Sequence, residues 1–403
     1  MYKIIFKLAF KNAFLRLSRT ILVIMMIAVS MSMMVSIEGL YDGVILSMAD
    51  KTKRSDCGEI SLYSKDYRTS KALSDTIKNA ITLQKELQKN PDIQASVLRL
   101  KADGLSATAR KSAFSTIIGI NLLQEEHFGE FSKFLKEGKL TLDKRGVLIG
   151  SELAKTLKAK LGSKIIFSTQ DATGEINDML LRVRGIVQTN NIALDGTALF
   201  VNKEKLHNFL MIPSSQTTQI AIRSDVVTLQ KQLQEDYPTL DVKSFLELYP
   251  MIPQMQDMMV IFNTMTFFIV MSVVFIGIMG VMYVSILDRI REFGIMRSIG
   301  MSYKLIRFQI FLEALFVGVI GYILGAILGY FALVYLQTYG LDLSEFADGL
   351  ASFGQSSTVF ATIKSNYFTS TFAAIVIASL LSVLLPLRKI KHMNTIEVTK
   401  VDI

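Results

Sequence analysis

Few residues of this 403-residue chain have the types and spacing that catalysis requires. Cys57 is the only cysteine, so it cannot form an internal disulfide. The three histidines, His127, His207 and His392, are scattered without ligand spacing, which argues against a metal site. Neither a GxxxxGK[ST] phosphate loop nor a Ser/His/Asp grouping stands out. The sequence therefore predicts a non-enzymatic chain that binds no metal or cofactor of its own.

The segment Asp288–Ser302, DRIREFGIMRSIGMS, has the pattern of a short amphipathic helix that Gly300 would end. Its apolar residues recur every three positions: Ile290, Phe293, Met296 and Ile299. Its charged residues occupy much of the remaining surface: Arg289, Arg291, Glu292 and Arg297. Such a helix can lie on a bilayer or insert into a groove of a cytosolic partner, and composition alone favours the bilayer.

A second group of informative residues lies in the apolar stretch that follows. Glu313, with Gln309 one turn before it, is an ionisable group in a predicted span, which costs at least ~2.5 kcal/mol at the bilayer centre. Its nearness to Arg307 favours packing or pairing near the interface over a proton relay. Gly321, Gly325 and Gly329 form overlapping small-xxx-small repeats, which predict a close helix–helix contact.

These segments must be positioned by four apolar stretches that are each long enough to cross ~30 Å of hydrocarbon. We expect membrane spans over residues 17–40, 256–287, 303–337 and 367–387. The mean hydropathy of +0.38 agrees with a membrane protein. A large, mostly polar segment, residues 41–255, separates the first span from the second. The fold class predicted is four transmembrane α-helices with a large α/β (α+β) extracytoplasmic domain inserted between helices 1 and 2.

The distribution of charge predicts the orientation. Residues 1–16, the connection 288–302 and the tail 388–403 are rich in Lys and Arg, whereas the loop 338–366 is acidic. Because Lys and Arg concentrate on the cytoplasmic side, both termini and the connection are expected there. The same rule explains the net charge of +9 without nucleic acid as a partner. No clear Ala-x-Ala site follows the first apolar run, so we expect a retained span rather than a signal peptide.

The first residues carry two stripes at helical spacing. The basic stripe is Lys3, Lys7 and Lys11, and the aromatic stripe is Phe6, Phe10 and Phe14. A helix lying along the inner membrane surface would have this pattern, and an ordinary basic flank explains it equally well.

The 41–255 segment reads as a folded domain. Strand-like runs include Gly58–Ser64, Ile93–Leu100 and Gly104–Arg110, and Ser70–Lys89 has a helical stripe. Gly146–Thr169 reads as strand, helix, Gly162 stop and strand. We expect two subdomains, residues 114–208 and a second one made of 41–113 with 209–255.

Methionine is abundant, with 20 residues, and clusters where the first and second spans meet the inserted domain. The cluster includes Met33, Met34, Met255, Met258 and Met259. Flexible thioethers suit a surface that accommodates varied acyl chains, so a substrate gate is one interpretation. Ordinary apolar filling is the other, and by numbers alone it is favoured.

The segment RIREFGIMRSIGMS with the Glu313/Gly-rich span resembles the FtsX/MacB-type permeases of ABC transporters. The resemblance covers the whole chain: IIGIN (Ile117–Asn121), Gly146–Ile165 and VRGIVQT (Val183–Thr189) resemble the family's periplasmic core domain. LPLRKIKHMNTIEVTKV, with Pro386, resembles its closing pattern. The resemblance implies that 288–302 is a coupling helix docking on a cytosolic ATPase dimer, which holds ATP and Mg²⁺.

Within that family the chain looks most like the lipoprotein-releasing LolC/LolE group, which implies a second permease, a paralogue or a second copy, and extraction of lipoproteins from the inner membrane. Ser168–Leu181 is shorter than the LolC hairpin that captures a periplasmic carrier and lacks its prolines, which argues against carrier capture by this subunit. The implied mechanism is mechanotransmission. The alternatives are MacB-like export through a periplasmic adaptor and FtsX-like regulation of a cell-wall hydrolase.

Overall fold

The computed structural model describes residues 2–346, 349 and 358–391. By its contacts the chain divides into two compact units. A helical unit comprises residues 1–44, 256–342 and 358–403, and an α/β unit comprises 45–255 and 343–357. Most of the predicted tail 388–403, with His392, and the centre of the predicted loop 338–366 lie outside the described residues.

The helical unit contains four helices that are long and apolar enough to cross a membrane among the described residues. Its elements are α1 (Tyr2–Ala13), α2 (Leu17–Thr52), α11 (Met251–Asp288), α12 (Ile290–Ser298), α13 (Tyr303–Thr338), α15 (Ser365–Ser382) and α16 (Leu384–Lys391), with the short strands β11 (Leu341–Asp342) and β12 (Thr358–Val359). The predicted fold class is confirmed.

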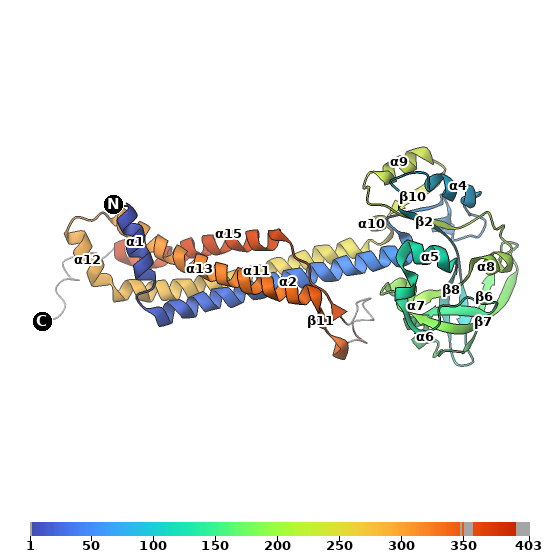
Figure 1. Ribbon diagram of the computed structural model, residues 1–403, viewed down its shortest axis with the longest axis horizontal. Helices are drawn as coiled ribbons and strands as arrows, with labels where there is room; N and C mark the ends of the chain where they lie inside the picture. The colour runs from blue at the N-terminus through green and yellow to red at the C-terminus, as the bar shows by residue number, and fades with distance from the viewer. Residues whose placement is uncertain (1, 347–348, 350–357, 392–403) are drawn as a thin grey trace. The chain divides into compact units, whose positions relative to one another are not determined.

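The spanning helices run side by side around one apolar core (Figure 1). That core joins Ile27 and Met31 of α2 to Ile278 of α11, Ile310 of α13 and Ile375 of α15. Where α15 begins, Tyr367 donates a 2.5 Å hydrogen bond to Asp42 of α2. Lys364, the residue before α15, also pairs with Asp42. Burial and this carboxylate contact therefore hold α15 against α2.

Helices α2 and α11 are longer than a bilayer requires. Their 36 and 38 residues correspond to about 54 and 57 Å at ~1.5 Å per residue, against ~30 Å of hydrocarbon. The last turns of α2, from Ile45, belong to the α/β unit, and α11 begins at Met251 within the same unit. The helix that contains the predicted first span, residues 17–40, continues without a break to Thr52 and into a π-turn, η1 (Lys53–Cys57).

The α/β unit is built on one ten-stranded sheet. Its strands are β1 (Ile60–Ser64), β2 (Ala95–Ala107), β3 (Ser112–Ile120), β4 (Leu135–Gly138), β5 (Gly146–Gly150), β6 (Lys164–Gln170), β7 (Ile176–Val187), β8 (Ala198–Asn202), β9 (Gln219–Arg223) and β10 (Leu240–Ser244). Its helices are α3 (Tyr67–Ser70), α4 (Ala80–Leu87), α5 (Leu122–Gly129), α6 (Ser151–Thr156), α7 (Ile192–Thr197), α8 (Lys203–Phe209), α9 (Leu229–Asp236) and α10 (Phe245–Leu248), with 3₁₀ turns η2 (Phe131–Phe134) and η3 (Ser344–Phe346).

Strand β2 is shared by two lobes. Its first half, Ala95–Arg99, pairs antiparallel with β9, next to β1 and β10. Its second half, Leu100–Ala107, pairs with β3. From β3 the sheet runs in the order β8, β5, β7 and β4. Strand β6 pairs with both β2 and β7. Each lobe has its own apolar core, one around Leu62 and Ile222 and one around Ile117 and Phe167.

Two local predictions were wrong. The runs predicted at Ile93–Leu100 and Gly104–Arg110 belong to a single strand, β2 (Ala95–Ala107), because the residues between the two runs also pair with β3. The helix predicted over Ser70–Lys89 shortens to α4, since Ile77 bridges Thr217 and Asn79 takes a left-handed φ of 55°.

Candidate coupling site

Helix α12 lies between the second and third spans, and local backbone geometry explains where it ends. Gly300 adopts a φ of +95°, and its N–H donates to the Arg297 carbonyl at 3.0 Å. The N–H of Met301 reaches back to the Met296 carbonyl at 2.9 Å, so the helix is closed as a C-terminal turn. A left-handed residue is required here, which explains the glycine.

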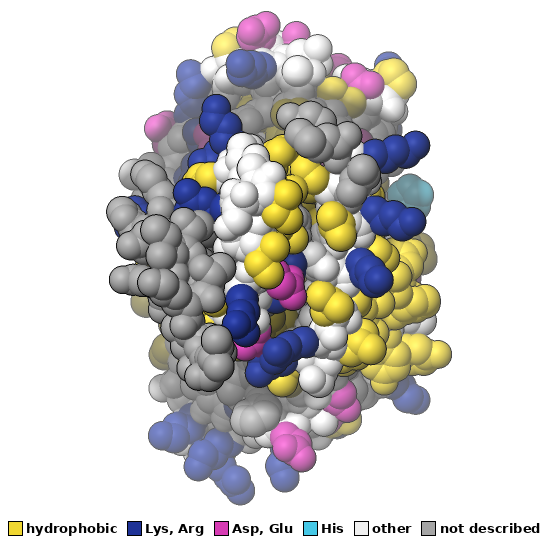
Figure 2. All heavy atoms as spheres, turned by 90° about the vertical axis from the view of Figure 1, so that its left-hand side faces the viewer, with side chains coloured by type: hydrophobic (Ala, Val, Ile, Leu, Met, Phe, Trp, Pro, Cys, Tyr) yellow, Lys and Arg dark blue, Asp and Glu magenta, His cyan; other side chains and the backbone are white. Residues whose placement is uncertain are grey.

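The burial of α12 divides its residues into two faces. Phe293 is 1% exposed and packs into the core of the spanning helices, and Met296 packs partly against that core. The side chains of Arg291, Glu292, Ile295 and Ile299 are exposed, with Ile299 at 80%. Phe293 and Met296 therefore hold α12 on the bundle, and the surface available to a partner is the face of Ile295 and Ile299. Figure 2 shows this end of the molecule, where Lys and Arg side chains surround exposed apolar ones.

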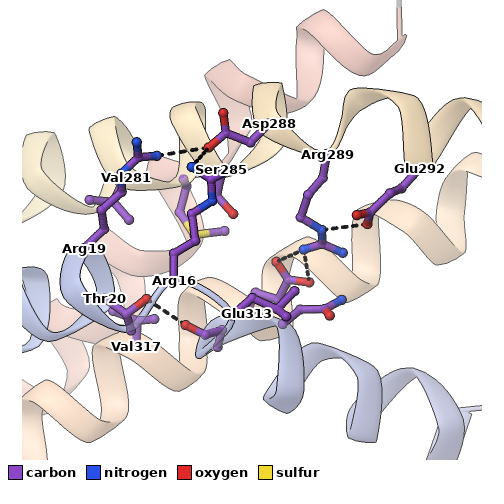
Figure 3. Close-up of a pocket in the computed structure, with 14 residues that line it drawn as sticks. Arg16, Arg19, Thr20, Val281, Ser285, Asp288, Arg289, Glu292, Glu313 and Val317 are labelled. Atoms are coloured by element: carbon purple, nitrogen blue, oxygen red, sulfur yellow. Dashed lines mark hydrogen bonds and ion pairs between the residues drawn. The ribbon is translucent and has the colours of Figure 1, made fainter.

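Arg289, directly before α12, ties this helix to α13. Its Nη1 donates to both carboxylate oxygens of Glu313 at 3.1 Å, and its Nε donates to Glu292 at 3.0 Å (Figure 3). Gln309 also donates to Glu313, at 3.1 Å. Arg289 and Glu313 are 8% and 3% exposed, so removal of either side chain would leave the other charge largely buried without its main partner. Glu313 thus forms an ion pair, but with Arg289 and not with the nearby Arg307.

A cavity of about 260 Å³ opens beside this pair. Arg16, in the turn before α2, and Arg19, in its first turn, both bind the same oxygen of Asp288, at 2.8 and 3.0 Å (Figure 3). Asp288 is the last residue of α11. The N-terminal segment, the end of α11 and the start of α12 are thus held together by ion pairs on one side of the bundle.

The predicted glycine contact lies between α13 and α2. A Cβ at Gly321 would be 2.8 Å from Ile27 Cβ, and one at Gly325 would be 2.7 Å from Met31 Cβ and 2.8 Å from the Ala28 carbonyl oxygen. At Gly329 the nearest atom, Ser32 Cα, is 3.2 Å away. Glycine at these positions lets the two helices approach closely.

The methionines predicted as a gate differ in exposure. Met33 and Met258 are 64% and 52% exposed, whereas Met34 is 1% exposed and Met255 and Met259 are partly buried. One turn beyond Met34, Glu38 accepts a 3.1 Å hydrogen bond from Asn263 of α11. Oε2 of Glu38 and Oδ1 of Asn263 are both buried without a hydrogen-bond partner among the described residues.

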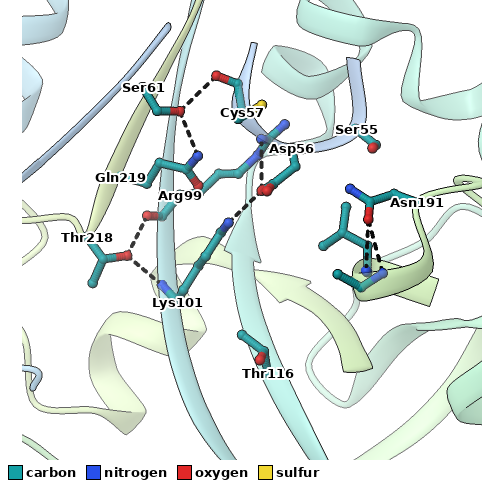
Figure 4. Close-up of polar contacts among 12 residues, drawn as sticks. Ser55, Asp56, Cys57, Ser61, Arg99, Lys101, Thr116, Asn191, Thr218 and Gln219 are labelled. Atoms are coloured by element: carbon teal, nitrogen blue, oxygen red, sulfur yellow. Dashed lines mark hydrogen bonds and ion pairs between the residues drawn. The ribbon is translucent and has the colours of Figure 1, made fainter. Parts of the chain in front are cut away.

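Sequence reasoning missed a buried polar network in the α/β unit. Asp56, near the end of η1, accepts from Lys101 of β2 at 2.5 Å (Figure 4). It also accepts from the Tyr249 hydroxyl at 2.5 Å. Tyr249 in turn accepts from Asn191 of the other lobe at 3.0 Å. Burial and the neighbouring Asp56 carboxylate raise the pKa of Tyr249 well above its usual range, so its hydroxyl remains a donor.

The same network contains a buried ion pair. Arg99 of β2, 1% exposed, makes two hydrogen bonds to Glu125 of α5 at 2.7 and 2.5 Å. Its remaining Nη1 lies 3.8 Å from Asp56. The Asp56 carboxylate thus joins the segment that follows α2 and the segment that precedes α11 to the central strand β2. Arg99 interrupts the apolar run Val97–Leu100 and Lys101 follows it directly, and this was the signal available in the sequence.

Replacing Glu125 with glutamine is expected to destabilise the α/β unit by about 3–5 kcal/mol, because the Arg99 charge would stay buried without its partner. Pulse proteolysis of the full chain in detergent measures this change. The double variant Arg99→Met/Glu125→Leu removes both charges and should lie much closer to the unsubstituted protein. Equal losses in both variants would contradict the buried-pair explanation.

Comparison with known proteins connects this arrangement to a family. Residues 20–238 match the model of the MacB-like periplasmic core domain, and residues 264–395 match that of the FtsX-like permease C-terminal domain. The chain is 23% identical to the lipoprotein-releasing system transmembrane protein LolE of Haemophilus influenzae, over 66% of this chain and 67% of LolE. It is 26% identical to LolC of Buchnera aphidicola over 53% of this chain and 55% of LolC.

A macrolide export ATP-binding/permease protein, MacB of Campylobacter jejuni, is 33% identical over 100 residues, 25% of this chain and 16% of that protein. The chain thus spans about a sixth of this relative. The crystal structure of the periplasmic region of MacB from Actinobacillus actinomycetemcomitans aligns with 48% of the chain and 92% of that region, at 18% identity and a TM-score of 0.34. On the family models, the chain belongs to the ABC transporter permeases of the MacB/FtsX type, with a MacB-like periplasmic core domain after its first span.

Proposed function

We propose that this chain is the permease subunit of an ABC transporter that extracts lipoproteins from the outer leaflet of the inner membrane by mechanotransmission. A separate cytosolic ATPase dimer binds ATP and Mg²⁺ and docks on α12. Both termini and α12 are cytoplasmic, and the α/β unit is periplasmic. The observation that carries the proposal is the bracing of α12: Phe293 and the Arg289–Glu313 pair fix it to the spans, while Ile295 and Ile299 stay exposed.

In this mechanism a movement of the ATPase displaces α12, and the buried contacts pass the displacement to α11 and α13. Helices transmit such a movement well when they are continuous, and α2 and α11 each run unbroken for 36 and 38 residues. In the α/β unit the Asp56–Tyr249 hydrogen bond joins the chain segments next to both helices, so the two move together. Closure of this unit then lifts the substrate, and no transmembrane channel is needed.

The relationship to LolE, which covers two thirds of both chains, supports lipoprotein as the substrate. The exposed side chains of Met33 and Met258 offer adaptable apolar surface for acyl chains. The partner in the membrane is a second permease, either a paralogue or another copy. Export of small molecules or peptides is the second candidate, because 100 residues are 33% identical to MacB. The experiment is mass spectrometry of the ligands that co-purify: acylated peptides support lipoprotein release, and their absence beside a bound adaptor protein supports export.

Substituting both Ile295 and Ile299 with aspartate is expected to abolish co-purification of the ATPase, because the exposed apolar contact becomes charged while the bundle stays folded. Affinity purification from membranes measures this. The control is Leu123→Asp, at an 84% exposed position of the α/β unit, which should leave the ATPase bound. Retention of the ATPase by the α12 variant would contradict docking on this face. Phe293→Asp is unsuitable as a test, since it would place a charge in the core.

A further inference from the structure

Helix α1 carries three parallel stripes that differ in chemistry. Ile5, Ala9 and Ala13 are buried, at 1%, 0% and 8% exposure. The next stripe is aromatic, with Phe6 and Phe10 at 54% and 51% exposure. The third stripe is cationic and exposed: Lys3, Lys7 and Lys11. Because residues four apart share a helix face, the aromatic stripe lies between the buried stripe and the lysines.

The buried stripe and the aromatic rings fix α1 on the third span. The rings of Phe6 and Phe10 meet Phe316 of α13 edge to face, at centroid distances of 5.0 and 5.6 Å. Helix α1 is therefore anchored beside a membrane helix while half of each of its own rings remains uncovered by the chain. A row of half-exposed aromatic rings flanked by lysines suits the boundary between acyl chains and headgroups, where the rings meet the acyl chains and the ammonium groups reach the phosphates.

The charge around α1 is not neutralised by the described part of the chain. Residues 1–19 contain five Lys and Arg and no Asp or Glu. Among the described residues, none of the ion pairs involves the three lysines. Arg16, in the turn after α1, and Arg19, in the first turn of α2, add two more charges and share the single carboxylate of Asp288. Both arginines line the 260 Å³ cavity and are about half exposed, at 56% and 45% of their side chains. Each guanidinium has five N–H donors, so donors remain for a second anion.

We propose that α1 and the Arg16/Arg19 turn form a binding site for acidic phospholipids of the cytoplasmic leaflet. The phosphate of one headgroup binds at the arginines, and further acidic headgroups bind along the lysine stripe. The leaflet assignment rests on the proposed orientation of the chain, but the site itself does not depend on the substrate. A phosphate held by the remaining donors lies beside the Asp288 carboxylate, so the negative charge of Asp288 weakens lipid binding at this site.

The test is enrichment of phosphatidylglycerol around the full chain in nanodiscs of phosphatidylcholine with a minor fraction of phosphatidylglycerol, measured by mass spectrometry of the lipids that stay bound in detergent. We expect phosphatidylglycerol to be enriched severalfold over the bulk. The triple variant Lys3→Gln/Lys7→Gln/Lys11→Gln should lose most of that enrichment, since each lysine near an acidic surface contributes a factor of about five. Enrichment should also fall with rising salt.

A charge-matched control removes three exposed lysines of the α/β unit, Lys78→Gln/Lys85→Gln/Lys89→Gln, and should keep full enrichment. Asp288→Asn frees the two arginines and should raise phosphatidylglycerol enrichment above that of the unsubstituted chain. The proposal is overturned if phosphatidylglycerol is not enriched, if the α1 variant and the control lose equal amounts, or if Asp288→Asn lowers enrichment. These outcomes leave the proposed function untouched, because they do not involve the ATPase or the substrate.

Discussion

Replacing Glu313 with glutamine is expected to destabilise the helical unit by about 3 kcal/mol and to loosen α12. Glutamine keeps the shape of the side chain but removes the charge that faces Arg289 at 3.1 Å. Arg289 is 8% exposed, so its charge would stay buried with only Glu292 as a partner. Hydrogen–deuterium exchange of the amides in Ile290–Ser298, together with the melting temperature in detergent, measures both effects.

The matched control is Glu292→Gln. It removes the other carboxylate that Arg289 binds, but Glu292 has a side chain that is 56% exposed, so the loss should stay within about 1 kcal/mol. Faster exchange in α12 for Glu313→Gln than for Glu292→Gln supports the buried pair as the brace. Similar exchange in both variants would show that α12 is held by Phe293 and its apolar neighbours alone.

Replacing Gly325 with leucine is expected to separate α13 from α2 and to cost more than the ~1–3 kcal/mol typical of overpacking. Even the Cβ of an alanine at this position would be 2.8 Å from the Ala28 carbonyl oxygen, which belongs to the helix backbone and cannot rotate away. We expect Gly325→Ala to lower the melting temperature measurably and Gly325→Leu to prevent recovery of folded protein.

Two other glycines serve as controls, because a Cβ at either of them would have more space than at Gly325. A Cβ at Gly280 of α11 would meet nothing within 4 Å, so Gly280→Ala should be neutral or slightly stabilising. At Gly329 the nearest atom is 3.2 Å away, so Gly329→Ala should fall between the two. A melting temperature for Gly325→Ala equal to that for Gly280→Ala would rule out a tight contact between α2 and α13.

Features that depend on composition and length could be predicted from the sequence. Apolar runs of membrane length predicted the four spanning helices. In lipid, the N–H and C=O groups of the backbone must bond to one another, and a helix satisfies them within one segment. The glycine contact was also predictable, since the repeat Gly321, Gly325, Gly329 occupies one helix face. That α2 is the partner helix could not be predicted, because small residues indicate a close approach but do not identify the helix that packs there.

Features that depend on distant pairing could not be predicted. The apolar stripe of 288–302, which includes Phe293, was expected to contact a bilayer or a cytosolic partner. Instead Phe293 packs against the chain's own spanning helices. That left Ile295 and Ile299 outside. Arg289 and Glu313 are 24 residues apart, and the hydropathy pattern treats one as part of a connection and the other as part of a span. Asp56 and Tyr249 meet across 193 residues, which no local pattern reports.

The measurement that tests the central claim most directly is ATP-driven release of a lipoprotein from proteoliposomes. The vesicles would contain this permease, its ATPase and a fluorescent triacylated peptide, with an acyl-binding acceptor in the medium. We predict that ATP transfers the peptide to the acceptor, and that the Ile295→Asp/Ile299→Asp variant does not support transfer. ATP hydrolysis that is stimulated by this permease but moves no acylated peptide would contradict lipoprotein release as its function.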